Sequence, residues 1–417
     1  MLPEVPKVEG AGRPAPRGWY TGHMRSLAVL VVAAASLACS AAAHAAEPAP
    51  LPLTVRRDVL ETVFAESLTF RLDAEATEAT DAGGPRITGI VLRFVVGDEA
   101  VRNRRVPEFA PGARVSAVVE DDLVRGQVPP TAEIAWWWEL TDAGGRVAQT
   151  PRRTQRYMDE AFDWRSLDGD VRVWYYGDGG APTAADRARA AEAQAEARSA
   201  LAKLEALIGA LPEETVELVL YRQQADLRRA MMARGDVYEA RLATLGARVS
   251  RHVVLLDWGS ISRGMGRDAL GQVLHHELSH VVLHLRLGRD WIEVPTWLDE
   301  GLAMFAEGPL GGAEAAALEG ALEQDDLMSV RSLTSFPGDA TRVTQAYGQS
   351  RDFVAYLIES GGEARFRELL TAHARGTRRF EDSLEAVYGF DQLGMYNAYR
   401  DARGLAPAAP ADQEDTP

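Results

Sequence analysis

The chain has 417 residues, 46% hydrophobic and 25% charged, a balance typical of a soluble globular protein with two or three domains. Its net charge of −16 argues against nucleic acid or an anionic membrane surface as the main partner, because phosphate binding requires a basic face. The one cysteine, Cys39, lies near the amino terminus, so disulfides and cysteine-based sites are not expected in the rest of the chain. Any metal must therefore be held by His, Asp and Glu.

Residues 1–46 are expected to be a targeting leader. Residues 24–26 (MRS) form a short basic region, residues 27–38 an apolar core, and residues 43–45 (AHA) a small-x-small cleavage site. We therefore predict an exported protein, secreted or associated with the cell envelope. Two alternatives stay open, namely an uncleaved membrane anchor and a lipoprotein signal that ends at Cys39.

Residues 47–180 predict an antiparallel β-sandwich domain. Apolar and polar residues alternate in short stretches that are separated by Gly- and Asp-rich turns, as in many sandwiches. The clearest stretches are RITGIVLRFVV (86–96), ARVSAVV (113–119), AEIAWWWEL (132–140) and VRVWYYG (171–177).

Three consecutive tryptophans in the third stretch suggest a carbohydrate-binding platform, but strand geometry favours a structural role. Alternate residues of a strand face opposite sides, so Trp136 and Trp138 are expected in the core and Trp137 outside.

Residues 181–404 predict a mainly helical domain with a small β-sheet, which makes the whole protein α+β. A long Ala-rich helix is expected over 182–210, capped by Thr183 and ended by Gly209. The Pro-rich residues 405–417 are expected to be a disordered tail. The remaining predictions are strands at 217–221 and 252–258 and helices at 268–287, 295–307, 313–323, 342–360, 363–374 and 379–400.

The sequence His276-Glu277-Leu278-Ser279-His280 is an H-E-x-x-H motif on one of these helices. Residues i and i+4 lie on one helix face, so His276 and His280 can converge on a single ion. Glu277 leans toward the same site without being a ligand and can act as a general base toward water there. The motif therefore predicts a catalytic Zn²⁺ site.

A third ligand is required, because a catalytic zinc usually has three protein ligands and one open position. His284 lies eight residues from His276, about 12 Å along the helix, too far to share the ion with both other histidines. His275 points about 100° away from His276, so both are expected to be bystanders or outer-shell groups. A carboxylate must complete the site, and the candidates are Asp290, Glu293, Asp299 and Glu300, of which only one of the last two can face the metal.

The motif followed by P-x-W-L-D-E-G-L-A resembles the gluzincin metallopeptidases, and most of all the bacterial peptidase MA-like family. The resemblance covers about residues 215–375 and implies that Glu300, 20 positions after His280, is the third ligand. It also implies that Tyr347, in the sequence AYGQS, stabilises the oxyanion, although Ser350 replaces the family's glycine. The longer motif with a third histidine and the aminopeptidase signature G-x-M-E-N are both absent.

Two further expectations concern the surroundings of the motif. Glu307 lies two turns after Glu300, where it could bond a ligand histidine, but a solvated glutamate at the helix end is the favoured interpretation. The resemblance implies that the strand at 252–258 is an edge strand that binds the substrate backbone.

Together these features predict an exported zinc metallopeptidase that hydrolyses peptide bonds in a peptide or protein substrate. Glu277 and Tyr347 are its expected catalytic residues, and His276, His280 and Glu300 its metal ligands. A second hypothesis is an envelope binding or assembly protein that uses a gluzincin scaffold without turnover. No nucleic acid partner is expected, and a membrane only through an uncleaved leader.

Overall fold

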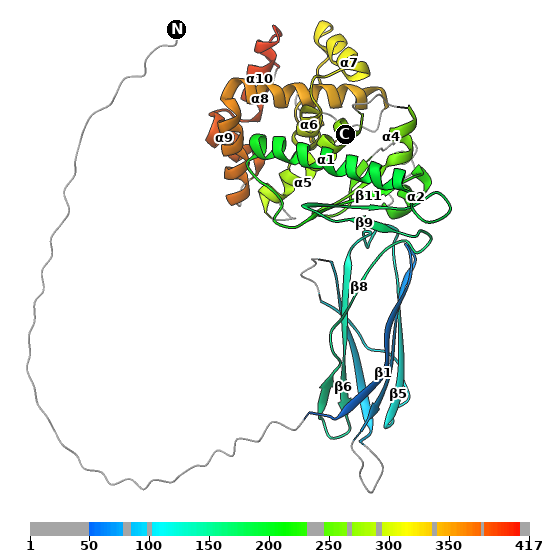
Figure 1. The fold of residues 1–417 in the computed structure, drawn as a ribbon. Helices are drawn as coiled ribbons and strands as arrows, with labels where there is room; N and C mark the ends of the chain where they lie inside the picture. The colour runs from blue at the N-terminus through cyan, green and yellow to red at the C-terminus, as the bar shows by residue number, and fades with distance from the viewer. Residues whose placement is uncertain are drawn as a thin grey trace, which may run out of the picture. The chain divides into compact units, whose positions relative to one another are not determined.

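The computed structural model describes residues 50–77, 85–97, 102–231, 246–264, 269–288, 294–335, 340–376 and 379–408. The predicted leader and most of the predicted tail therefore lie outside the described residues. Residues 49–417 form one compact unit, which contains both strands and helices (Figure 1). None of the helices within these described ranges is long and apolar enough to cross a membrane.

The amino-terminal part of this unit consists of two antiparallel sheets that enclose one hydrophobic core, as expected for a sandwich. Alternate residues of the strands at 67–76 and 114–122 are buried, because one face packs on the core and the other faces solvent. The first sheet contains β1 (Leu53–Val63), β2 (Ser67–Ala76) and β5 (Arg114–Asp122). The second contains β4 (Asn103–Arg105), β3 (Ile87–Val96), β6 (Glu133–Asp142), β7 (Val147–Gln149) and β8 (Arg153–Arg156).

The tryptophan run lies on β6 as predicted. Trp136 and Trp138 are buried, and both indole N–H groups donate to one carboxylate oxygen of Asp58, at 2.8 and 3.1 Å. Trp137 lies on the opposite side, partly exposed, with the Arg152 guanidinium 5.4 Å from its ring centre. The run is therefore part of the core, and its shared acceptor satisfies two buried donors at once.

A third sheet joins the sandwich to the helical part, in the order β12-β13-β11-β10-β9. Strands β10, β11 and β13 are parallel to one another, and the short strands β12 and β9 lie antiparallel at the two edges. The bounds are β9 (Arg165–Leu167), β10 (Val171–Tyr175), β11 (Val216–Tyr221), β12 (Gly246–Arg248) and β13 (Val253–Asp257).

Both faces of this third sheet are covered, which explains why every residue of β11 and β13 is buried. Val254 and Leu256 of β13 pack in the core of the helical part, whereas Val253 and Leu255 pack in the core shared with the sandwich. In Figure 1 the strands β9 and β11 accordingly lie between the sandwich and the helices.

Two predictions about strands were wrong. The strand at 171–177, assigned to the sandwich, is β10 and pairs with β9 and β11 of the third sheet. The strand at 252–258, expected at an edge, is β13 and lies between β12 and β11. Alternation identifies a strand but not its neighbours, and the true edge strand β12 is only three residues long, too short to give a pattern.

Helices occur in all the predicted ranges, but the short helices at 224–230 and 258–264 were not predicted. The two helices predicted at 342–360 and 363–374 form one element, interrupted by the non-helical Gly362 at φ 75°. Thr183 caps α1 in a capping box with Asp186, and Gly209 ends it in the left-handed conformation at φ 78°. The bounds are α1 (Ala184–Ile208), α2 (Gln224–Ala230), α4 (Trp258–Gly264), α5 (Ala269–Leu287), α6 (Thr296–Glu307), α7 (Gly312–Glu323), a 3₁₀ turn (Ser332–Thr334), α8 (Ala340–Arg375), α9 (Phe380–Tyr388) and α10 (Gln392–Ala402).

The carboxy-terminal helices differ from the prediction in two places. The single helix expected at 379–400 is divided into α9 and α10 by Gly389, which adopts φ 82°. The disorder expected from residue 405 does not apply to residues 405–408. There Arg400 donates to the carbonyl of Ala406, and the amide of Ala408 donates to Asn397.

Candidate metal centre

Helix α5 carries the H-E-x-x-H motif and is held in the core by its apolar face. Leu274, Leu278, Val281 and Val282 of this face are fully buried against the third sheet and neighbouring helices. His276 and His280 therefore lie together on the other side of the helix, with ring centroids 5.1 Å apart. This is the convergence that the i, i+4 spacing predicts.

Helix α6 brings Glu300 to the two histidines. One Glu300 carboxylate oxygen lies 3.5 Å from Nε2 of His276 and 3.8 Å from Nε2 of His280. The three ligand atoms lie within 4.8 Å of one another. Ligands 2.0–2.1 Å from a tetrahedral zinc are separated by about 3.3 Å, so this donor set fits the ion after small side-chain shifts. No other such group occurs in the part of the chain that the structure describes.

A close crossing of α6 and α8 fixes the position of Glu300. A β-carbon at Gly301 would lie 2.5 Å from the backbone oxygen of Ser350 in α8, so only glycine permits this approach. Trp297, one turn earlier on α6, is fully buried and packs on Phe353 of α8. The glycine after Glu300 thus has a packing role.

Two further carboxylates bind the Nδ1 atoms of His276 and His280. Nδ1 of His276 donates to Glu307 at 2.7 Å, and Nδ1 of His280 donates to Asp299 at 2.6 Å. These bonds orient both rings so that their Nε2 atoms face Glu300, an arrangement that is common around zinc. The prediction of a solvated Glu307 was therefore wrong, and sequence reasoning considered Asp299 only as a ligand.

The other two histidines of the motif region do not reach the cluster. His284 contacts the second oxygen of Asp299 at 3.4 Å, and His275 donates through Nδ1 to the carbonyl of Gly271. His284 therefore touches only the partner of His280, and His275 points elsewhere, in agreement with helix geometry. The candidates Asp290 and Glu293 lie outside the described residues.

We expect Glu307→Ala to weaken zinc binding by about 10- to 100-fold, because His276 loses the partner that orients its ring. Competition with a chromophoric chelator would measure the change in affinity. Glu323→Ala is the matched control, since Glu323 is an exposed glutamate at the end of α7. Equal chelator sensitivity of the two variants would contradict a role of Glu307 at the metal.

Buried charges strongly perturb the titration of the cluster. Burial alone would lower the pKa of His276, but its bonds to Glu300 and Glu307 raise that pKa well above the usual range. Burial likewise opposes the charged form of His280, yet Asp299 raises its pKa. These contacts favour protonation of both imidazoles, and a cation that binds here must displace those protons.

Glu277 lies on the same side of α5, against the edge strand β12. The backbone N–H of Arg248 donates to its carboxylate at 3.0 Å, and a β-carbon at Gly246 would lie 2.7 Å from its Cγ. Burial raises the pKa of Glu277 above that of an exposed glutamate. The raised pKa lies closer to neutral pH than that of an ordinary glutamate, and a general base works best when its pKa is near the pH of the reaction.

Tyr347 lies on α8 with a partly buried side chain. It precedes Ser350, the residue that meets Gly301 of α6, by three positions, or about 4.5 Å along the helix. The neighbouring Gly348 abuts the backbone of α7, where a β-carbon would lie 2.6 Å from the Glu314 carbonyl oxygen. Tyr347 is thus one turn from the crossing that positions Glu300.

The part of the chain that contains this site resembles a known protein family. Residues 196–402 match the family model described as the Peptidase MA superfamily. The match covers α5, α6 and α8 and supports a zinc peptidase of the gluzincin type. No curated protein matches the chain.

Among solved structures, the chain is similar to an M1 zinc metallopeptidase from Deinococcus radiodurans, crystallised as a mutant with a bound substrate. The identity is 15%, with 87% of this chain and 97% of that chain covered and a TM-score of 0.37. A second likeness is to the sensor domain of the anti-sigma factor RsgI4 from Pseudobacteroides cellulosolvens, with 12% identity, 26% and 75% coverage and a TM-score of 0.18.

Proposed function

We propose that the protein is an exported zinc-dependent metallopeptidase. The observation that carries this proposal is the convergence of His276, His280 and Glu300, with the buried carboxylate of Glu277 on the same helix. A donor set of two imidazoles and one carboxylate is typical of catalytic zinc and leaves a position open for substrate or water. A purely structural zinc site has no need of such an adjacent base.

When bound, zinc would supply a Lewis acid that polarises the scissile carbonyl and lowers the pKa of water. Glu277 accepts a proton from the attacking water and then passes it to the nitrogen of the leaving amine. Glu307 and Asp299 hold the two imidazoles in the required tautomer through their Nδ1 atoms.

We propose that Tyr347 donates a hydrogen bond to the carbonyl oxygen as negative charge builds on it. The support is the matching position in the gluzincin pattern and the crossing of α8 and α6 one turn away. Removing one such donor typically costs about 10²–10³ in kcat. Tyr347→Phe should therefore lower kcat to that extent with KM and zinc content little changed, and unchanged turnover would reject the role.

The purified mature chain tests the proposal directly. We expect about one zinc per chain, cleavage of a mixed peptide library read by mass spectrometry, and loss of that cleavage after chelation with recovery on adding zinc. Binding of zinc without cleavage of any peptide would favour the binding or assembly protein instead. A folded chain that takes up no zinc would reject both the site and the mechanism.

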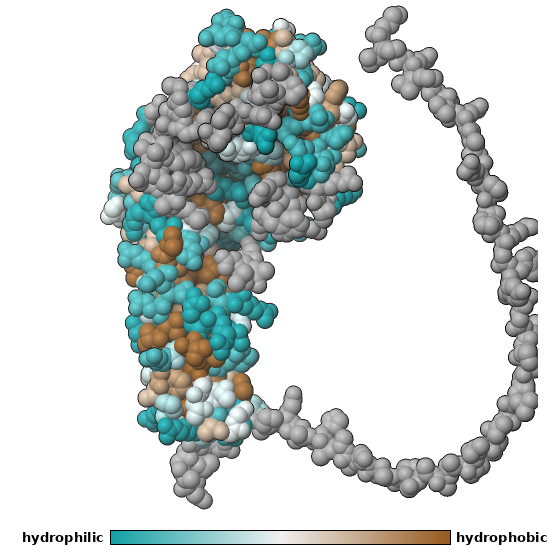
Figure 2. Space-filling view, turned by 180° about the vertical axis from the view of Figure 1, so that it is seen from behind, coloured by the Kyte–Doolittle hydropathy of each residue, from teal (hydrophilic) through white to brown (hydrophobic). Residues whose placement is uncertain are grey.

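Export is part of the proposal and rests on the basic, apolar and small-x-small pattern of residues 24–46. Figure 2 shows hydrophobic residues interspersed with hydrophilic ones over the surface of the sandwich. Intact-mass measurement of the protein from the producing cell would test it. A chain that begins at Ala46 or Glu47 is the expected product, and an unprocessed cytoplasmic chain would contradict export.

A further inference from the structure

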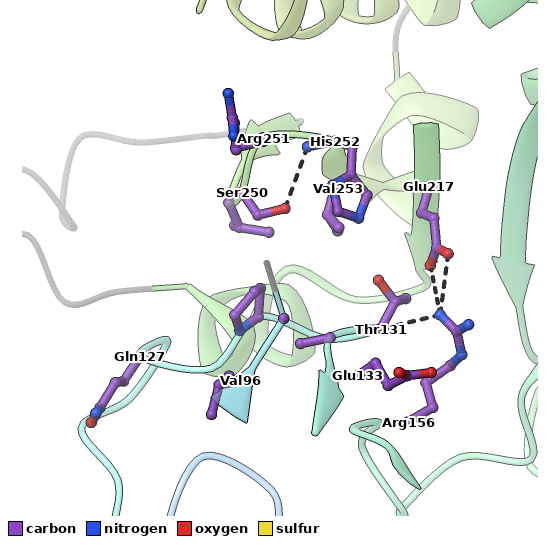
Figure 3. Close-up of a pocket in the computed structure, with 14 residues that line it drawn as sticks. Val96, Gln127, Thr131, Glu133, Arg156, Glu217, Ser250, Arg251, His252 and Val253 are labelled. Carbon is purple, nitrogen blue, oxygen red and sulfur yellow. Dashed lines mark hydrogen bonds and ion pairs between the residues drawn. The ribbon is translucent and has the colours of Figure 1, made fainter. Parts of the chain in front are cut away.

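A cavity of about 420 Å³ lies where the sandwich meets the hairpin between β12 and β13. One wall comes from the hairpin, with Val249, Ser250 and Val253, and the other from the end of the sandwich, with Val96 and Thr131. Figure 3 shows the two groups of side chains facing each other across the cavity. Its volume lies within the range of roughly 300–1,000 Å³ that is typical of ligand sites.

The cavity continues from the edge strand that contacts Glu277. The amide of Val249 donates to the carbonyl of Val253, so in this antiparallel pair Gly246 and Arg248 direct their N–H and C=O groups away from β13. The outward N–H of Arg248 is the group that Glu277 accepts. Ser250 follows two residues later, about 7 Å along the strand, so the cavity begins close to the candidate catalytic base.

Thr131 is an unusual residue in the sandwich wall. Its φ of 71° is rare for a β-branched residue, and its backbone is held there by bonds to Tyr157 and Arg156. The side chain is only 4% exposed, and its hydroxyl oxygen has no hydrogen-bond partner within the described residues. Figure 3 shows this oxygen directed toward the hairpin side of the cavity. A strained residue with an unmet buried hydroxyl is typical of a ligand-binding position.

The remaining lining combines hydrocarbon with polar and charged groups, the latter from Gln127, Glu133, Arg251 and His252. Val96, Ala132, Val249 and Val253 supply hydrocarbon surface. The Arg156 guanidinium lies 3.1 and 3.2 Å from the two carboxylate oxygens of Glu217, which also accepts from Arg172. Two arginines and two glutamates line the cavity, so their formal charges cancel and the cavity suits an uncharged side chain accompanied by one polar main-chain group.

We propose that this cavity is a substrate subsite that binds an uncharged, apolar side chain on the amino-terminal side of the scissile bond. The outer edge of β12 pairs with no other strand among the described residues, and a peptide added there in the favoured antiparallel sense runs from Ser250 toward Gly246. Residues that reach the cavity therefore precede the bond beside Glu277. The inference rests on the proposed peptidase activity, and it gives the enzyme a preference for peptides with several residues before the scissile bond, one of which contacts the sandwich.

The experiment compares nested peptides with the zinc-loaded full chain. One cleaved peptide is shortened from its amino end until a single residue precedes the scissile bond, and separately from its carboxyl end. We expect amino-terminal shortening to lower kcat/KM by at least about tenfold, the value of a small apolar group in a fitted pocket. An apolar-to-Asp change at the residue that enters the cavity should lower it at least as much.

Substitutions in the cavity test whether the preference for the longer peptide arises there. Ala132→Phe fills the cavity and should abolish the advantage of the long peptide over the short one. Thr131→Val keeps the branched shape and should reduce that advantage about 3- to 10-fold through loss of one hydrogen bond. Ala143→Phe, at an exposed turn beyond the other end of β6, is the matched control and should leave the advantage unchanged. Thr131→Val decides the outcome if Ala132→Phe does not fold.

The two possible failures are distinguishable. No cleavage of any peptide by the zinc-loaded wild type would defeat the proposed function. Cleavage that is insensitive to amino-terminal length, or that depends on the carboxyl-terminal extension alone, would overturn the subsite while leaving the peptidase intact. An advantage of the long peptide that survives both cavity variants would overturn it as well.

Discussion

Replacing Glu277 with glutamine should lower kcat for peptide cleavage by about 10²–10⁴-fold while about one zinc per chain stays bound. The glutamine amide has the shape of the carboxylate, and its oxygen can still accept from the Arg248 N–H, so the contact with β12 is preserved. It cannot accept a proton from water. Single-turnover cleavage of a library-derived peptide, together with metal analysis of the same sample, measures both quantities.

The matched control for this change is Glu319→Gln, which alters an exposed glutamate on α7 in the same way. It should retain wild-type turnover and zinc content. If Glu277→Gln still cleaves at the wild-type rate, the proton is handled by another group and the mechanism proposed for this helix is wrong. If it loses its zinc, Glu277 has a structural role at the metal that its position against Gly246 does not predict.

Replacing Glu300 with alanine should remove both the zinc and the activity. His276 and His280 then offer two protein ligands, whereas a catalytic zinc usually has three. We expect zinc content to fall well below one per chain after dialysis. The rise in melting temperature that added zinc gives the wild type should disappear, because that stabilisation depends on binding to the folded state.

Comparison with Glu277→Gln separates metal binding from catalysis. Glu277→Gln should keep the zinc-dependent rise in melting temperature and lose turnover, whereas Glu300→Ala should lose both. Glu319→Ala is the control for the loss of a carboxylate on an exposed helix face. A Glu300→Ala protein that binds zinc as tightly as the wild type would exclude Glu300 as a ligand. Asp299 would then be the next carboxylate to test, since it already contacts His280.

The zinc helix and most of the fold were predictable because their signals are local. The spacing in H-E-x-x-H places two imidazoles on one helix face whatever surrounds them, and capping by Thr183 and Gly209 is a property of neighbouring residues. The tryptophan run followed strand alternation in the same way. Helix periodicity also showed that Asp299 and Glu300 could not both face the metal, but it did not choose between them; the family resemblance indicated Glu300.

The sequence by itself determined which residue types could hold zinc and on which helix the pair would lie. Only the tertiary structure decided which carboxylates face the two histidines. The crossing of α6 and α8 at Gly301 turns Glu300 toward both Nε2 atoms, and the same helix delivers Asp299 and Glu307 to the Nδ1 atoms. The tertiary structure likewise decided that β12, which pairs with β13, is the edge strand beside Glu277. Such contacts join residues whose sequence separation carries no periodic signal, because they depend on how whole elements pack.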